Sequence, residues 1–63
     1  MAAKLKEYRE IKGLSIEELA FKAGVDKDII TEIEKGTAKI TTGKVMKKIA
    51  EALDVRVSDI FFN

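Results

Sequence analysis

Residues 15–34, with the sequence SIEELAFKAGVDKDIITEIE, decide the fold that the rest of this 63-residue chain must accommodate. Ser15 and Glu18 have the spacing of a capping box, in which a hydroxyl and a carboxylate each accept a backbone N–H at a helix start. A helix is therefore predicted from Ile16. Gly24 ends it, because glycine readily adopts the positive φ of a helix C-terminus. Its inward stripe has the spacing i, i+3, i+4 and i+7 and comprises Ile16, Leu19, Ala20 and Ala23.

A second short helix follows this one almost without a loop. Asp26 is a favourable N-cap, and Ile30 and Ile33, with Val25 just before them, supply the inward face. Two helices joined by so tight a turn must cross at a steep angle, which is the geometry of a helix-turn-helix. The motif is predicted to span about residues 15–35.

The flanking sequence predicts three further helices. The first covers residues 2–12 and ends at Gly13, the fourth covers about residues 42–53, and a short last helix lies near residues 57–61. Met46 is expected to fill the core rather than to bind a cofactor. The chain is thus predicted to be all-α, a compact five-helix domain spanning residues 1–63 with a central helix-turn-helix.

Composition excludes several classes of function. The chain has no cysteine and no histidine, which excludes disulfides, thiol chemistry and the usual zinc sites. No residue is predicted to be catalytic, and neither a metal nor a cofactor is expected. No apolar run approaches the roughly 20 residues of a membrane helix, and the N-terminus lacks the apolar stretch of a signal peptide. The protein is therefore expected to be soluble and cytoplasmic, without a membrane partner.

Charge is unevenly distributed although the net charge is only +1. Residues 35–50 contain five lysines and no acidic residue, whereas residues 26–34 contain four acidic residues and one lysine. The first segment suits phosphate groups and the second does not.

The stretch GLSIEELAFKAGVDKDIITEIEKG resembles the helix-turn-helix of the phage repressor and Cro family (lambda-repressor-like, XRE type), and the resemblance continues through KKIAEALDVRVSDIF. It implies a sequence-specific, repressor-type transcriptional regulator of bacterial or phage type, associated with the nucleoid. The helix near residues 27–35 would enter the major groove of double-stranded DNA. The residues that carry the match are Gly13, Leu14, Ser15, Glu18, Leu19, Ala20, Ala23, Gly24, Val25, Ile30, Ile33, Glu34 and Gly36.

The resemblance also implies a role for particular positions. Arg9 would form a structural salt bridge with Glu34, although its place on the first helix alone would equally suit a solvated surface residue. The residues expected to read bases are Lys27, Asp28, Ile29, Thr31 and Glu32. Those expected to hold phosphates are Lys35, Thr37, Lys39, Thr41, Thr42 and Lys44. A homodimer on a palindromic operator would use the end of the chain, around Arg56, Val57 and Phe62.

Some residues depart from the family's pattern. Ile16 stands where glutamine is frequent, Asp54 where glycine is usual, and Arg56 where a serine or threonine often caps the last helix. Phe21 is expected to be exposed, and together with Ile29 it would suit a protein partner. The alternative to DNA binding is therefore a protein-interaction domain, or an engineered scaffold, that keeps the fold and has weakened DNA reading.

Overall fold

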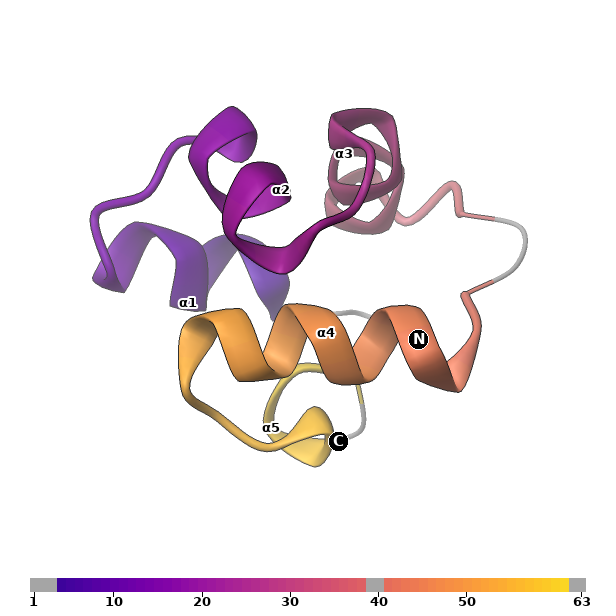
Figure 1. The fold of residues 1–63 in the computed structure, drawn as a ribbon. Helices are drawn as coiled ribbons and strands as arrows, with labels where there is room; N and C mark the ends of the chain where they lie inside the picture. The colour runs from indigo at the N-terminus through magenta and orange to yellow at the C-terminus, as the bar shows by residue number, and fades with distance from the viewer. Residues whose placement is uncertain (1–3, 39–40, 62–63) are drawn as a thin grey trace.

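The computed structural model describes residues 4–38 and 41–61, and over these residues its regular secondary structure is entirely helical (Figure 1). The helices are α1 (Leu5–Ile11), α2 (Ile16–Ala23), α3 (Lys27–Lys35), α4 (Gly43–Leu53) and α5 (Val57–Phe61). In Figure 1, α2 and α3 lie above α4, and α5 lies beneath it. The predicted all-α class and five-helix order are confirmed. The extent of the domain over residues 1–63 stays a prediction.

Short-range hydrogen bonds set the ends of α2 and α3. The Ser15 hydroxyl accepts the Glu18 N–H at 3.0 Å, and the Glu18 carboxylate accepts the Ser15 N–H at 2.8 Å, so the predicted capping box is present. Gly24 follows α2 with a φ of 72°. The Asp26 carboxylate then accepts the Asp28 N–H at 2.8 Å and caps α3. Only residues 24–26 separate the two helices, which confirms the tight turn.

The structure differs from the predicted ends of the first and fourth helices. The predicted helical assignment of Lys4 was wrong, because Lys4 precedes α1 as its N-cap; residues 2 and 3, also predicted to be helical, lie outside the described residues. The Lys4 N–H donates to the Ile60 carbonyl at 2.8 Å, a contact with α5 that a local sequence pattern does not reveal. Lys12 follows α1 as its C-cap. Thr42 likewise stands outside α4, because its hydroxyl accepts the Val45 N–H at 3.2 Å and caps the helix.

The core forms where α2 packs against both α3 and α4. Ile16 and Met46 are half-buried against this core, which confirms that they face inward, and Val45 is half-buried beside them. Phe61 is buried, so it closes the core through α5. The buried residues come from all five helices and comprise Leu5, Leu19, Ala20, Ala23, Ile30, Ile33, Ile49, Ala50, Leu53, Ile60 and Phe61.

The junction between α4 and α5 carries two of the departures from the family's pattern. Asp54 has a φ of 58° and a ψ of 43°, a left-handed conformation that costs an L-residue roughly 1–2 kcal/mol, although aspartate tolerates it better than most. The Arg56 N–H donates to the Asp59 carboxylate at 2.9 Å. Since arginine offers no side-chain acceptor in return, only half of a capping box forms. The junction is therefore less well capped than the start of α2.

Candidate nucleic-acid interface

One face of α3 packs against the core and the other faces solvent. Ile30 and Ile33 are buried, whereas Lys27, Asp28 and Glu32 are exposed. Three of the five side chains expected to read bases are therefore accessible to a ligand. The exposed face carries one ammonium group and two carboxylates, so it offers both hydrogen-bond donors and acceptors.

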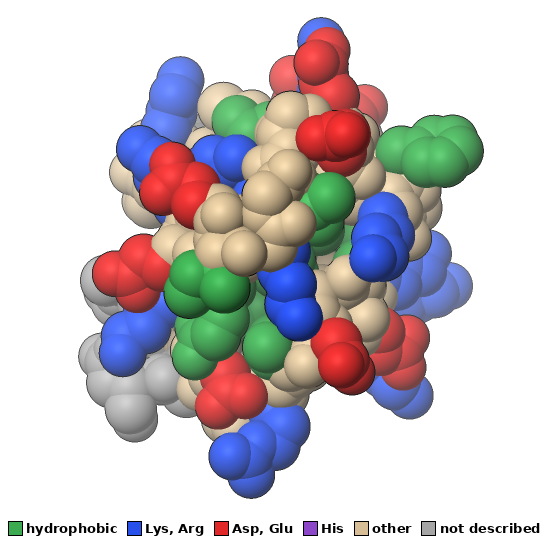
Figure 2. Space-filling view, turned by 90° about the vertical axis from the view of Figure 1, so that its left-hand side faces the viewer, with side chains coloured by type: hydrophobic (Ala, Val, Ile, Leu, Met, Phe, Trp, Pro, Cys, Tyr) green, Lys and Arg blue, Asp and Glu red, His purple; other side chains and the backbone are tan. Residues whose placement is uncertain are grey.

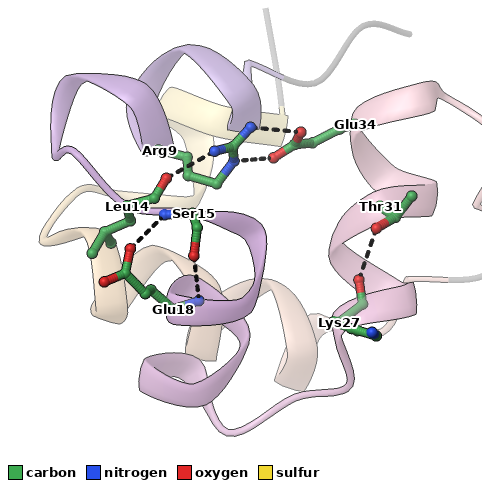
Figure 3. A network of polar contacts seen from close by, with 7 residues as sticks. All are labelled: Arg9, Leu14, Ser15, Glu18, Lys27, Thr31 and Glu34. Atoms are coloured by element: carbon green, nitrogen blue, oxygen red, sulfur yellow. Dashed lines mark hydrogen bonds and ion pairs between the residues drawn. The ribbon is translucent and has the colours of Figure 1, made fainter.

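The other two expected base-reading residues are only partly accessible. Ile29 is half-buried and packs against the core, so only part of its side chain is available to a ligand. Its position next to Ile30 turns part of its side chain inward. Thr31 is also half-buried, and its hydroxyl donates to the Lys27 carbonyl at 3.1 Å, as Figure 3 shows. The Thr31 oxygen remains able to accept a hydrogen bond.

A carboxylate of α2 lies beside the first residue of α3. The Glu17 Oε2 atom is 4.0 Å from the Lys27 Nζ atom, and both side chains are largely exposed. Sequence reasoning missed this pair because the two residues are on different helices. No local signal in the sequence predicts the pair, because it depends on the angle at which α2 and α3 cross.

The lysines expected to hold phosphates flank the connection between α3 and α4. Lys35 is the last residue of α3, Lys44 lies in the first turn of α4, and both are exposed. Lys39 lies outside the described residues. Lys35 and Lys44 are therefore accessible to solvent, one at the C-terminus of α3 and the other at the N-terminus of α4.

The three threonines expected to hold phosphates differ in their engagement. Thr37 is exposed and its N–H donates to the Glu32 carbonyl at 2.9 Å, which satisfies the last turn of α3. Thr41 is half-buried, and Thr42 is exposed and caps α4. Thr42 thus has a structural role that is independent of any ligand.

The expected salt bridge between Arg9 and Glu34 is present and joins α1 to α3 (Figure 3). The Arg9 Nε atom lies 2.6 Å from Glu34 Oε2, and Nη2 lies 3.2 Å from Oε1, so the pair is bidentate. Nη1 donates to the Leu14 carbonyl at 2.8 Å. The side chains of Arg9 and Glu34 are only 11% and 8% exposed, which rules out a solvated Arg9. The pair holds the C-terminal half of α3 against the first helix.

The ionisation of Arg9 follows from this geometry. The side-chain hydrogen bond with Glu34 raises the pKa of Arg9 above its ordinary value, and the charge of Glu34 adds to the increase. Burial acts in the opposite direction. Arginine is therefore protonated here at any pH at which the fold is studied.

The residues expected at a dimer contact lie at the end of the described chain. Arg56 is exposed, and Val57 is half-buried against the core. Phe62 lies outside the described residues. The dimer contact stays a prediction.

An exposed aromatic residue stands on the outer side of α2. Phe21 is 91% exposed, as expected, and lines a shallow hollow with Glu17, Glu18 and Lys22. Ile11, at the end of α1, is 75% exposed and was missed. Its position off the stripe that contains Leu5 was the signal that could have found it.

Charged side chains of both signs are interspersed over the face of the molecule shown in Figure 2.

Within residues 4–38 and 41–61, no three His, Cys, Asp or Glu residues are grouped so that they could hold a metal ion. No helix in this part of the chain has the length and apolar character to cross a membrane.

The curated proteins that are similar to this chain include two regulators. The HTH-type transcriptional regulator SinR of Bacillus subtilis is 39% identical over 54 residues, which are 86% of this chain and 49% of SinR. The chain thus spans about half the length of that relative. The uncharacterized HTH-type transcriptional regulator MJ0272 of Methanocaldococcus jannaschii is 43% identical over 61 residues, which are 97% of this chain and 91% of that protein.

Two solved structures share the fold and more than a third of the sequence. The N-terminal DNA binding domain of SinR superposes with a TM-score of 0.80 at 39% identity and covers 86% of this chain and 78% of that chain. The restriction-modification controller protein C.AhdI from Aeromonas hydrophila superposes with a TM-score of 0.82 at 36% identity, covering 89% of this chain and 83% of that one.

A family model described as helix-turn-helix matches residues 5–60, from the start of α1 into α5. The match includes the capping box, the tight turn and the whole of α3. With the resemblance thereby confirmed, the chain belongs to the helix-turn-helix family of phage repressor and Cro type.

Proposed function

We propose that this protein is a sequence-specific, repressor-type transcriptional regulator whose α3 enters the major groove of an operator. The observation that carries the proposal is the exposed face of α3, a helix whose position is fixed by the rest of the fold. The turn at residues 24–26 and the pair of Arg9 with Glu34 hold α3 in place. The major groove admits an α-helix, and a braced helix can offer polar side chains to base edges in one register.

The side chains on this face would read different bases. The Lys27 ammonium would donate to guanine O6 and N7, and Asp28 or Glu32 would accept from the cytosine amino group. The accessible edge of Ile29 would contact a thymine methyl, and the Thr31 oxygen would accept a hydrogen bond. Carboxylates repel phosphates, so we expect binding to non-specific DNA to be weak and selected contacts to dominate.

Other parts of the chain would position the domain on DNA. Lys35 and Lys44, with Lys39 between them in sequence, would hold phosphates and carry no sequence information themselves. A homodimer formed around Arg56, Val57 and Phe62 would place two copies on half-sites about 34 Å apart in a palindromic operator. A regulator of this kind would act in the cytoplasm at the nucleoid and would have no enzymatic activity.

Substitution of Lys27 and Lys44 is expected to separate base reading from positioning. Lys27→Ala should lower the preference for particular base pairs by about 1–3 kcal/mol, because it removes a donor to base edges. Lys44→Ala should weaken binding to all sequences similarly and reduce the salt slope by about one unit, since one phosphate contact is lost. The measurement is binding to a panel of duplexes, each with one base pair changed, at several salt concentrations.

The panel requires a site, which selection from a random duplex pool at roughly physiological salt would supply. Two related half-sites in the recovered sequences would support both operator binding and the dimer. If Lys27→Ala and Lys44→Ala changed binding in the same way across the panel, the proposed roles would be wrong. Recovery of no preferred sequence would contradict the function itself.

A second candidate function, as a protein-interaction domain, is favoured by Phe21. A phenylalanine that is 91% exposed serves no purpose in the core, and it lies beside the carboxylates of Glu17 and Glu18. Exposed apolar groups next to charged ones are typical of protein contact sites. Ile29, the other residue expected to contact a protein partner, is half-buried and offers only part of its side chain.

Phe21→Ser is expected to abolish binding of a protein partner while the fold remains intact. Peptides selected by the wild-type chain from a random display library should lose at least about tenfold in affinity, because the exposed ring is the main apolar anchor of the hollow. The matched control is Ile11→Ser, which removes another exposed apolar side chain at the end of α1. Equal retention of the peptides by both variants would exclude Phe21 as the anchor.

A further inference from the structure

The first turn of α2 places a carboxylate beside the first residue of α3. We propose that Glu17 is a positioning residue that keeps Lys27 directed at base edges rather than at phosphates. The inference rests on the proposed function, since it concerns how Lys27 reads DNA. It assigns a role to a residue that makes no base contact itself.

The position of both residues is set by the caps on their helices. Glu17 lies between Ser15 and Glu18, whose reciprocal hydrogen bonds fix the first turn of α2. Lys27 follows Asp26, which caps α3 through the Asp28 N–H. The caps hold the local backbone at both residues, and the Glu17 carboxylate lies 4.0 Å from the Lys27 ammonium.

Glu17 is the charged group that pairs with Lys27 in the described part of the chain. An ion pair joins Lys27 to Glu17, whereas Asp28 and Glu32 take part in no ion pair among residues 4–38 and 41–61. The side chains of Lys27 and Glu17 are 62% and 77% exposed, so the pair contributes little to stability. The ion pair instead affects the direction of the Lys27 side chain, because the Glu17 carboxylate draws the ammonium group toward α2.

A lysine at a DNA interface has two kinds of acceptor within reach. Its ammonium is a point charge on a flexible stem, and phosphates attract it without regard to sequence. A carboxylate beside it both attracts the ammonium and repels the phosphates. With Glu17 present, the phosphate alternative is less favourable and the uncharged base edge is preferred. Without Glu17, the Lys27 ammonium would contact the phosphates of the DNA backbone instead.

Glu17→Gln therefore has a specific expected signature. Binding to non-specific duplexes should tighten by about threefold or more, and the salt slope should steepen by about one unit, because Lys27 now contacts a phosphate. At the same time, discrimination at the base pair read by Lys27 should fall from about tenfold to about threefold or less. Tighter binding to non-specific DNA together with weaker base discrimination would indicate a positioning role. If Glu17 had only a structural role, its substitution would weaken both the binding and the discrimination.

Glu18→Gln is the matched control. It removes the same charge from the neighbouring residue, and glutamine can replace glutamate in a capping box. We expect it to change affinity for all duplexes by one common factor and to leave preference unaltered. In a Lys27→Ala background, Glu17→Gln should no longer change preference or the salt slope.

The outcomes distinguish the inference from the function on which it rests. Equal effects of Glu17→Gln and Glu18→Gln, on a wild-type protein whose preference Lys27→Ala does relax, would overturn the role of Glu17 and leave operator binding intact. Persistence of the Glu17→Gln effect without Lys27 would also overturn it. A wild-type protein with no base preference would overturn both proposals.

Discussion

Arg9→Ala should lower the free energy of unfolding by about 3–5 kcal/mol, because it leaves the carboxylate of Glu34 buried without a partner. The Glu34 side chain is only 8% exposed, and both of its oxygens accept from Arg9. The Leu14 carbonyl also loses its donor. A chain of this length is stable by only about 3–9 kcal/mol in total, so the variant should lose a large part of its stability. Chemical denaturation followed by circular dichroism measures the change.

The double variant Arg9→Met with Glu34→Leu is the control for charge. Apolar residues of similar volume leave no unpaired charge, so the pair of substitutions should cost less than Arg9→Ala alone. The raised pKa of Arg9 places loss of its charge far above neutral pH, with stability present below that pKa and lost only as pH rises through it. The loss in Arg9→Ala should thus be constant across neutral pH. A loss below about 1 kcal/mol would mean that the pair behaves like a surface salt bridge.

Ile30→Ala is expected to lower stability by about 2–5 kcal/mol and to weaken DNA binding with it. Ile30 has no exposed surface, and with Ile33 it supplies the buried side chains of α3. Truncation leaves a cavity beneath the helix that carries the base-reading residues. Denaturation gives the stability, and binding to the selected operator gives the functional effect.

Two substitutions calibrate the Ile30 result. Ile30→Val removes one methylene group and should cost only about 0.5–1.5 kcal/mol. Ile11→Ala removes apolar atoms from a side chain that is 75% exposed, so it should change stability by no more than about 0.5 kcal/mol. If Ile30→Ala and Ile11→Ala had similar effects, α3 would not depend on the core for its position.

The helix-turn-helix was predictable because its signals are local. A hydroxyl three residues before a carboxylate, a glycine after the last apolar position and an aspartate two residues beyond it define both ends of α2 and the start of α3. Each acts through a hydrogen bond or a backbone conformation within one turn, as found at Ser15, Gly24 and Asp26.

The features that sequence reasoning missed depend on contacts between distant residues. The half-burial of Ile29 follows from how α3 packs against the core, and the pair of Glu17 with Lys27 follows from the angle at which α2 and α3 meet. The salt bridge of Arg9 came from the family resemblance, because helix position alone also allowed a solvated arginine. Roles in base reading depend on the DNA as well as the chain, so they stay proposals.

The hydrogen bond between Lys4 and Ile60 has a topological consequence. It brings the backbone before α1 against the backbone of α5, so the described polypeptide almost closes into a ring. Figure 1 shows that α5 lies on the far side of α4 from α3. The backbone that enters α1 is therefore fastened on the side of α4 opposite α3, away from the exposed face of α3.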